Sequence, residues 1–171
     1  LRDGLIADTG ETVTLTQQTS VIGEVGNNGT VDGSSLIIRS ENGELNNNAS
    51  GVINSNITVE SGVLNNKGIV NNVSMSGGTF NNEGVTDAQV VVNNGTFNNL
   101  AGGEVNRSGR LGNNAVVNNS GTWRLGSEDG AADSSTLDLN QSSIFNNSGE
   151  LIVDNTKNSI NLRGASTLYN T

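Results

Sequence analysis

The chain has 171 residues, enough for one ordinary domain, but only 32% of them are hydrophobic. Its net charge of -9 with only eight Lys and Arg disfavours binding to nucleic acid or to an anionic membrane surface. It has no apolar run of about 18 residues that would span a membrane. The absence of His and Cys removes the usual general base and the thiol nucleophile, so we expect no enzyme, metal or cofactor.

The first 26 residues show two weak strand patterns, at Val13-Thr14-Leu15 and Val21-Ile22. No signal peptide is visible before them. The chain begins in the middle of a phrase and stops inside a repeat. We therefore expect residues 1–171 to be a single segment excised from a longer protein.

From residue 27 onward one short phrase recurs, apolar-Asn-Asn-x-Gly-x-apolar. The first Asn of each copy stands at 27, 46, 65, 81, 98, 118, 146 and 170, with intervals of 16 to 28 residues. A repeat of this length is typical of a solenoid, in which each unit stacks on the next.

Each unit contains about three short strand patterns, and Gly and Asn separate them. Because three strands suit one coil of a solenoid, the sequence predicts an all-β parallel β-helix of about eight coils. Four columns of apolar residues are expected inside it. They are Val31, Val52, Ile69, Val85, Val105, Trp123 and Leu151; Leu36, Ile57, Val73, Val90, Leu137 and Ile160; Ile38, Val59, Met75, Val92, Leu139 and Leu162; and Leu45, Leu64, Phe80, Phe97, Val117, Phe145 and Tyr169.

The Asn pairs are interpreted as structural turns, because stacked amides bond one another along the axis of a solenoid. Asn and the Gly that follows also tolerate a left-handed turn. An outward polar strip for recognition is the alternative. The pairs are Asn46, Asn47, Asn65, Asn66, Asn81, Asn82, Asn98, Asn99, Asn118, Asn119, Asn146 and Asn147.

The longest interval, from Asn118 to Asn146, contains an acidic insertion at residues 126–135. Insertions in solenoids form loops that often carry binding, so a protruding acidic loop is expected. The candidate binding residues are Arg124, Glu128, Asp129 and Asp133. The three acids would also suit Ca²⁺, but their spacing fits no established calcium loop. A solvated insertion without function is the other reading.

The recurring phrase, with Gly- and Ser-rich strands between its copies, resembles the passenger regions of bacterial type V secreted proteins. These are the autotransporter adhesins and the filamentous-haemagglutinin-like exoproteins. The resemblance covers about residues 27–171, and the uneven intervals are closer to the autotransporters. It implies a right-handed parallel β-helix that is exported through the outer membrane and displayed on the bacterial cell surface.

The same resemblance implies a function in adhesion, virulence or biofilm formation. The expected partner is a host matrix protein or cell-surface glycoprotein, or the same protein on a neighbouring cell. One alternative is a structural spacer that presents another domain. A fragment of a glycan-active enzyme is a remote alternative, because acids such as Glu60, Glu83, Asp87 and Glu104 form no convincing pair. Ice binding is more remote, since Thr12-Val13-Thr14 is the only clear Thr-x-Thr.

Overall fold

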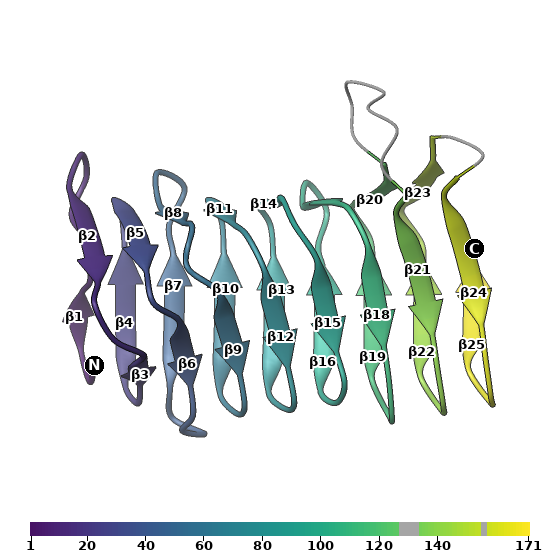
Figure 1. Cartoon of the computed structure of the whole chain (residues 1–171), viewed down its shortest axis with the longest axis horizontal. Coiled ribbons are helices and arrows are strands. Elements are labelled where there is room, and N and C mark those ends of the chain that lie inside the picture. The colour runs from purple at the N-terminus through teal and green to yellow at the C-terminus, as the bar shows by residue number, and fades with distance from the viewer. Residues whose placement is uncertain (127–133, 155–156) are drawn as a thin grey trace.

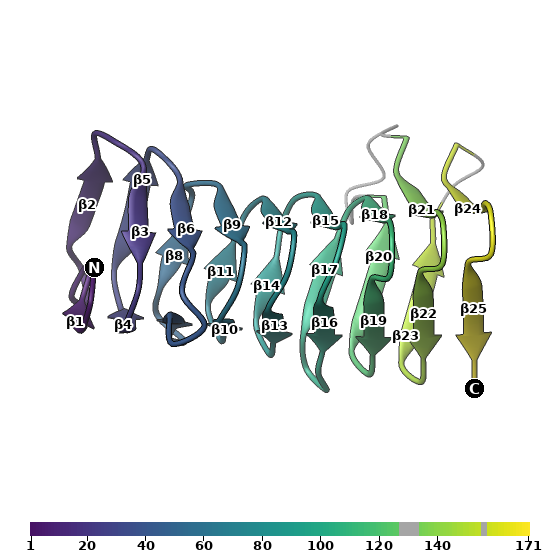
Figure 2. The ribbon, with the colours of Figure 1, turned by 90° about the horizontal axis from the view of Figure 1, so that it is seen from below.

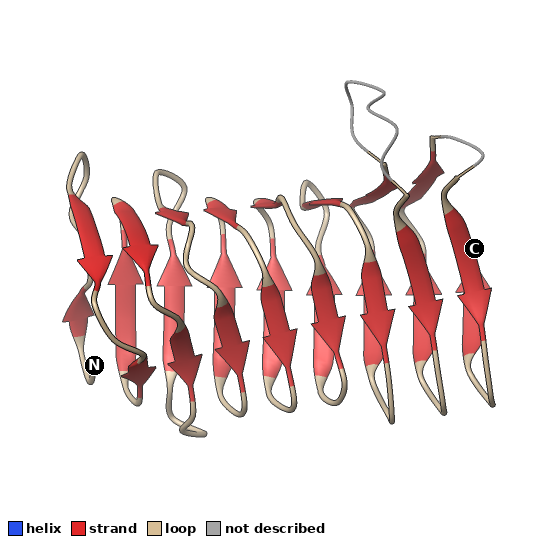
Figure 3. Ribbon diagram, viewed as in Figure 1, coloured by secondary structure: helices blue, strands red, loops and turns tan. Residues whose placement is uncertain are grey.

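The computed structural model describes residues 1–126, 134–154 and 157–171. Within these ranges the chain forms 25 short β-strands and no helix, so no helix of the described residues is long and apolar enough to cross a membrane. The strands assemble into three parallel sheets, here called A, B and C, which run the length of the molecule (Figures 1 and 3).

Sheet A has nine strands and sheets B and C have eight each. Sheet A contains β1 (Gly4–Leu5), β4 (Glu24–Asn27), β7 (Glu44–Asn47), β10 (Val63–Asn66), β13 (Thr79–Asn82), β16 (Thr96–Asn99), β19 (Val116–Asn119), β22 (Ile144–Asn147) and β25 (Thr167–Asn170). Sheet B contains β2 (Thr12–Leu15), β5 (Thr30–Gly33), β8 (Val52–Ile53), β11 (Ile69–Val70), β14 (Val85–Thr86), β17 (Glu104–Asn106), β20 (Thr122–Leu125) and β23 (Glu150–Val153). Sheet C contains β3 (Thr19–Val21), β6 (Leu36–Ile38), β9 (Ile57–Val59), β12 (Val73–Met75), β15 (Val90–Val92), β18 (Gly109–Leu111), β21 (Thr136–Leu139) and β24 (Ser159–Leu162).

The chain passes through A, B and C in turn and then repeats, so each strand pairs with its equivalent one coil before and one coil after. In Figure 1, with the N-terminus at the left, sheet C descends in front and sheet A ascends behind. Viewed from the N-terminal end, the chain therefore turns clockwise as it advances, and Figure 2 shows the same stack from below. The fold is a parallel β-helix of about eight coils, as the sequence predicts, and its right hand is the one that the resemblance implies.

The inner column of sheet A confirms the predicted stack of large apolar side chains. Leu64 pairs with Phe80 and Phe80 with Phe97, and the two Phe rings stack with their centroids 4.6 Å apart. The last member was predicted wrongly. Leu168 pairs with Phe145, whereas Tyr169 points outward with 57% of its surface exposed. A shift of one residue along a strand moves a side chain to the opposite face.

The register confirms both predicted columns of sheet C, and Gly109 and Leu111 fill the two positions that the prediction left empty. Only the last member of one column, Leu162, is exposed. The indole of Trp123 occupies the space beside Gly109, since a Cβ on Gly109 would lie 2.4 Å from Trp123 Cζ2. Trp123 is completely buried and donates from Nε1 to the backbone carbonyl of Arg107 at 3.1 Å. The single Trp is therefore a core residue.

The predicted column of sheet B is wrong over three coils. Its inward positions there are Ile53, Val70 and Thr86, and their predecessors in the chain face outward. These strands have only two residues, and both are apolar in the first two, so alternation gives no signal there. In the third strand the structure buries the Thr and leaves the Val outside. The outward residues are Val52, Ile69 and Val85.

The turn from sheet A to sheet B depends on one glycine per coil. A Cβ on these glycines would lie 2.1–2.7 Å from a backbone carbonyl oxygen of the preceding coil, closer than real atoms approach. None of them has a left-handed φ, so the conformational reason expected from the sequence is wrong and close stacking is the cause. They are Gly29, Gly51, Gly68, Gly84, Gly103, Gly121 and Gly149.

We expect Gly84→Ala to lower the free energy of unfolding by ~3 kcal/mol, at the upper end of the overpacking range. The new Cβ would lie 2.2 Å from the backbone oxygen of Gly68, which the stack holds in place. Gly112→Ala is the control, since its Cβ would meet only Asn93, with Oδ1 at 3.3 Å and Cα at 3.9 Å. Denaturant unfolding of both variants checks this, and equal losses would contradict the stacking argument.

Thr86 is completely buried, and its hydroxyl has no hydrogen-bond partner among the described residues. Thr86→Val removes that unpaired hydroxyl and keeps the shape, so we expect stability to rise by about 1 kcal/mol. Thermal melting measures this as a rise of about 3 °C for a chain of this size. A lower melting temperature would mean that the hydroxyl makes a hydrogen bond in solution.

Candidate functional site

The Asn pairs close the strands of sheet A, where alternation sends the second Asn inward and the first outward. The inward amides form a continuous row, here called the inner ladder. In each step Nδ2 donates to Oδ1 of the equivalent Asn one coil later, at 2.6–2.8 Å. The members are Asn27, Asn47, Asn66, Asn82, Asn99, Asn119, Asn147 and Asn170. The register thus gives Asn27 and Asn170 the second-Asn position, not the first.

Each inner amide also holds the turn that follows it. Asn66, for example, donates from Nδ2 to the backbone oxygen of Gly68 at 3.2 Å and to that of Val85 in the next coil at 3.1 Å. Buried polar atoms are costly unless they are paired, and these bonds pair all of those in the ladder except Asn27 Oδ1, which starts the row and has no partner among the described residues. The inner ladder is therefore a structural feature of the core, and the Asn residues form it from strand ends rather than from within turns.

The outward amides form a second row, the outer ladder, which runs in the opposite direction. From Asn65 onward, Nδ2 of each Asn donates to Oδ1 of the equivalent Asn one coil earlier, at 2.8–2.9 Å. The members are Asn46, Asn65, Asn81, Asn98, Asn118 and Asn146. The equivalent position is Gly26 in the coil before Asn46 and Tyr169 in the coil after Asn146, so the row ends at those two Asn residues.

Beside the outer ladder runs a second outward row of sheet A. From β10 to β22 it contains Val63, Thr79, Thr96, Val116 and Ile144, all half-buried. Together with Asn65, Asn81, Asn98, Asn118 and Asn146 these residues define what we call the neutral face. It contains no charged residue, although the chain has a net charge of -9.

The outward positions of the other two sheets are different. Sheet B presents Glu104, Arg124 and Glu150, and sheet C presents Arg110 and Asp138. Sheet C is also uncharged from β3 to β15, but there only one residue of each strand faces outward, so among the described strands sheet A offers the widest outward surface without charge. Its amides each retain a free N–H or carbonyl lone pair, so the surface both donates and accepts hydrogen bonds.

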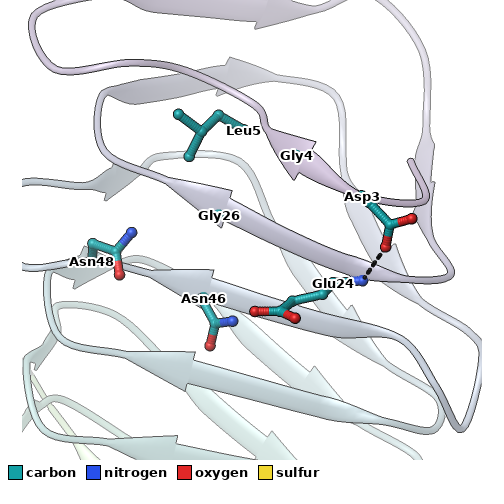
Figure 4. Close-up of a pocket in the computed structure, with 7 residues that line it drawn as sticks. All are labelled: Asp3, Gly4, Leu5, Glu24, Gly26, Asn46 and Asn48. Atoms are coloured by element: carbon teal, nitrogen blue, oxygen red, sulfur yellow. Dashed lines mark hydrogen bonds between the residues drawn. The ribbon is translucent and has the colours of Figure 1, made fainter.

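At its N-terminal end, sheet A has a surface pocket of about 580 Å³ (Figure 4). Asp3 and Glu24 supply carboxylates, and Asp3 Oδ1 accepts a hydrogen bond from the backbone N–H of Glu24 at 3.3 Å. The sequence does not predict this pocket, because Gly26 stands where the later copies of the repeat have an Asn of the outer ladder. The lining residues are Asp3, Gly4, Leu5, Glu24, Gly26, Asn46 and Asn48.

The binding residues expected around the insertion are only partly within the described chain. Arg124 Nη1 lies 2.8 Å from Asp154 Oδ2, a residue that the prediction did not include. Glu128, Asp129 and Asp133 lie outside the described residues, so the expected acidic loop is not described further. In the described ranges no group of three His, Cys, Asp or Glu side chains is placed to hold a metal ion.

The acids considered for glycan chemistry are dispersed. Glu60 pairs with Arg39 at 2.9 Å, and Glu83 lies 3.9 Å from Lys67 Nζ. Comparison of the chain with protein-family models, with curated protein sequences and with solved structures finds no match. The functional argument therefore depends on the surfaces of the fold itself.

Asn98 and Asn99 are adjacent in β16 but belong to different ladders, so a substitution at each compares the contributions of the two ladders to stability. Asn99→Ala leaves Asn119 Oδ1 and a turn carbonyl without their buried donor, so we expect a loss of ~3 kcal/mol in the free energy of unfolding. Asn98→Ala changes only the half-exposed outer ladder and should cost less than about 1 kcal/mol. Chemical denaturation measures both, and a larger loss for Asn98→Ala would contradict this division of roles.

Proposed function

We propose that this chain is an adhesive segment of a bacterial surface protein, exported through the outer membrane and displayed on the cell, and that it binds through the neutral face. The observation that supports the proposal is a charge-free surface extending over five strands of sheet A in a strongly acidic chain. Two acidic molecules repel least where neither presents charge, so this face favours contact with another copy or with a neutral glycoprotein.

The size of the face indicates how it would bind. Five strands at a spacing of about 4.8 Å give roughly 25 Å, and two side-chain rows are roughly 13 Å wide, or about 300 Å². A stable interface buries about 800 Å² on each partner. A single contact of this kind is therefore weak. Adhesion would arise from many displayed copies that act together, which raises avidity without any new contact.

The test is to display the chain on cells and measure both cell aggregation and attachment to surfaces coated with matrix protein. Thr79→Glu with Thr96→Glu places two charges on the neutral face, in adjacent coils. We expect at least about a tenfold loss of attached or aggregated cells, because avidity multiplies each weakened contact.

Thr58→Glu with Ser74→Glu is the matched control, since it adds the same charge to adjacent coils on the outward side of sheet C. Cells with this pair should adhere as the original does. Loss of aggregation alone would assign the face to self-association, and loss of attachment alone to a host surface. Full adhesion by both double variants would overturn the proposal.

A spacer function is the second candidate, and the register supports it. Val63 and Thr79 occupy equivalent positions, so deletion of residues 63–78 removes one complete coil and rejoins both ladders. A spacer shortened in this way changes the reach of whatever it presents by ~4.8 Å and leaves binding intact. A face that binds loses one coil of contact, and its avidity falls.

A further inference from the structure

The outer ladder has a gap at its N-terminal end. Asn46 is its first member, and the equivalent residue one coil earlier is Gly26, which has no side chain. The strand before that places Leu5 over the gap, with Cδ2 2.8 Å from the position of a Cβ on Gly26. The pocket of Figure 4 is this gap, open to solvent and bounded by Leu5 on one side and Asn46 on the other.

The gap leaves an amide donor without a partner. Asn46 Oδ1 accepts from Asn65 Nδ2 at 2.9 Å on its C-terminal side, and its own Nδ2 lies in the pocket on the side of the Glu24 carboxylate (Figure 4). Within the described chain this Nδ2 donates to no other residue, whereas every later outer amide donates to the one before it. The pocket therefore contains the donor end of the row, with the Glu24 carboxylate in the position relative to Asn46 that Glu44 has relative to Asn65.

The next amide along the row shows what this position accepts. Asn65 Oδ1 accepts from Asn81 Nδ2, and Asn65 Nδ2 donates to both Asn46 Oδ1 and Glu44 Oε1, all at 2.9 Å. Asn65 pairs with Asn46 of the preceding coil, and Glu44 is two residues before Asn46 in the same strand. A carboxamide in this environment has a donor for its oxygen and a carboxylate for its N–H.

The pocket repeats that environment around the missing side chain. Asn46 supplies the donor that Asn81 supplies to Asn65. Gly26 pairs with Leu5 of the preceding coil, and Asp3 is two residues before Leu5. Asp3 therefore has the same position relative to Gly26 that Glu44 has relative to Asn65. Its Oδ1 accepts the backbone N–H of Glu24 at 3.3 Å and, as a carboxylate oxygen, can accept a second donor.

We propose that this pocket binds the carboxamide of an external ligand, and that the ligand class is N-acetylated amino sugars. The acetamido oxygen accepts from Asn46 Nδ2, the acetamido N–H donates to the Asp3 carboxylate, and the methyl group lies against Leu5. A secondary amide suits this pair because its N–H and C=O point in opposite directions. The carboxylates of Asp3 and Glu24 repel an anionic ligand, so a neutral amide is selected over a carboxylate.

The probes are N-acetylglucosamine, glucose and glucosamine, each titrated into the chain in solution and followed by NMR chemical shifts. We expect N-acetylglucosamine to bind with a dissociation constant on the order of millimolar, as suits a small group with two hydrogen bonds. Glucose lacks the amide and should not bind. Binding of glucosamine at equal or greater strength would assign the carboxylates to a cation and overturn the proposal.

Gly26→Asn fills the gap with an amide of the chain itself, whose Oδ1 would accept from Asn46 Nδ2. The only close neighbour of the new Cβ is the flexible end of Leu5, so the variant should fold. We expect its affinity for N-acetylglucosamine to fall at least about tenfold. Asn46→Ala, which removes the donor and leaves the pocket open, should have the same effect.

Gly112→Asn is the matched control, because Gly112 lies at a distant turn, its φ is not left-handed and a Cβ there would meet only Asn93, with Oδ1 at 3.3 Å. It should bind as the original chain does, and circular dichroism checks that all variants are folded. Unchanged binding by Gly26→Asn would overturn the proposal. The test uses the chain in solution, so its result is independent of whether the neutral face is adhesive.

Discussion

The inner ladder is the interaction on which the rest of the structure depends. Each inner amide must meet its equivalent in the next coil, since a buried amide without partners costs more than a single hydrogen bond contributes. The chain therefore has to return to the same place after every coil, whatever its length. Asn119 still donates to Asn147 at 2.6 Å across 28 residues, and Asn66 to Asn82 at 2.8 Å across 16. The register of the sheets therefore stays constant although the intervals between coils differ in length.

The same amides explain why glycine follows them. Because Nδ2 also donates to the carbonyl of the turn, the turn lies directly against the strand end and is held close to the turn of the preceding coil. The resulting approach of backbone to backbone leaves no room for a Cβ at Gly68 or Gly84. A polar interaction inside the coil thus dictates a small residue at its corner, and the two together produce the recurring phrase of the sequence.

The sequence predicts the parts of the fold in which a repeat and an alternation agree. The Phe and Asn positions of sheet A and both columns of sheet C combine the two signals. Three strands of sheet B have only two residues, and in a pair such as Val52 and Ile53 neither alternation nor composition shows which residue faces inward. Tyr169 and Asn27 were displaced by one residue because the end copies of the phrase replace an Asn with Tyr or Gly. The pocket was missed for the same reason, since Gly26 is recognisable as a missing amide only once the register is known.

Stacking also determines where charge is placed. Equivalent outward residues lie about 4.8 Å apart, and at that distance two like charges repel by roughly 1 to 4 kcal/mol, depending on exposure. Neutral amides and Thr avoid this cost on sheet A, and elsewhere successive coils alternate sign, as in Arg39 with Glu60 or Arg110 beside Asp138.

The column of Asp3, Glu24 and Glu44 breaks that rule by stacking three acids in successive coils. Asn65 Nδ2 donates to Glu44 and offsets part of the repulsion there, but the equivalent donor for Asp3 is the side chain that Gly26 lacks. Two departures from the repeat, a missing amide and an uncompensated acid, thus coincide in one pocket. Departures from local rules without a compensating gain in stability are expected at functional sites. An external amide that supplied the missing group would satisfy both departures at once.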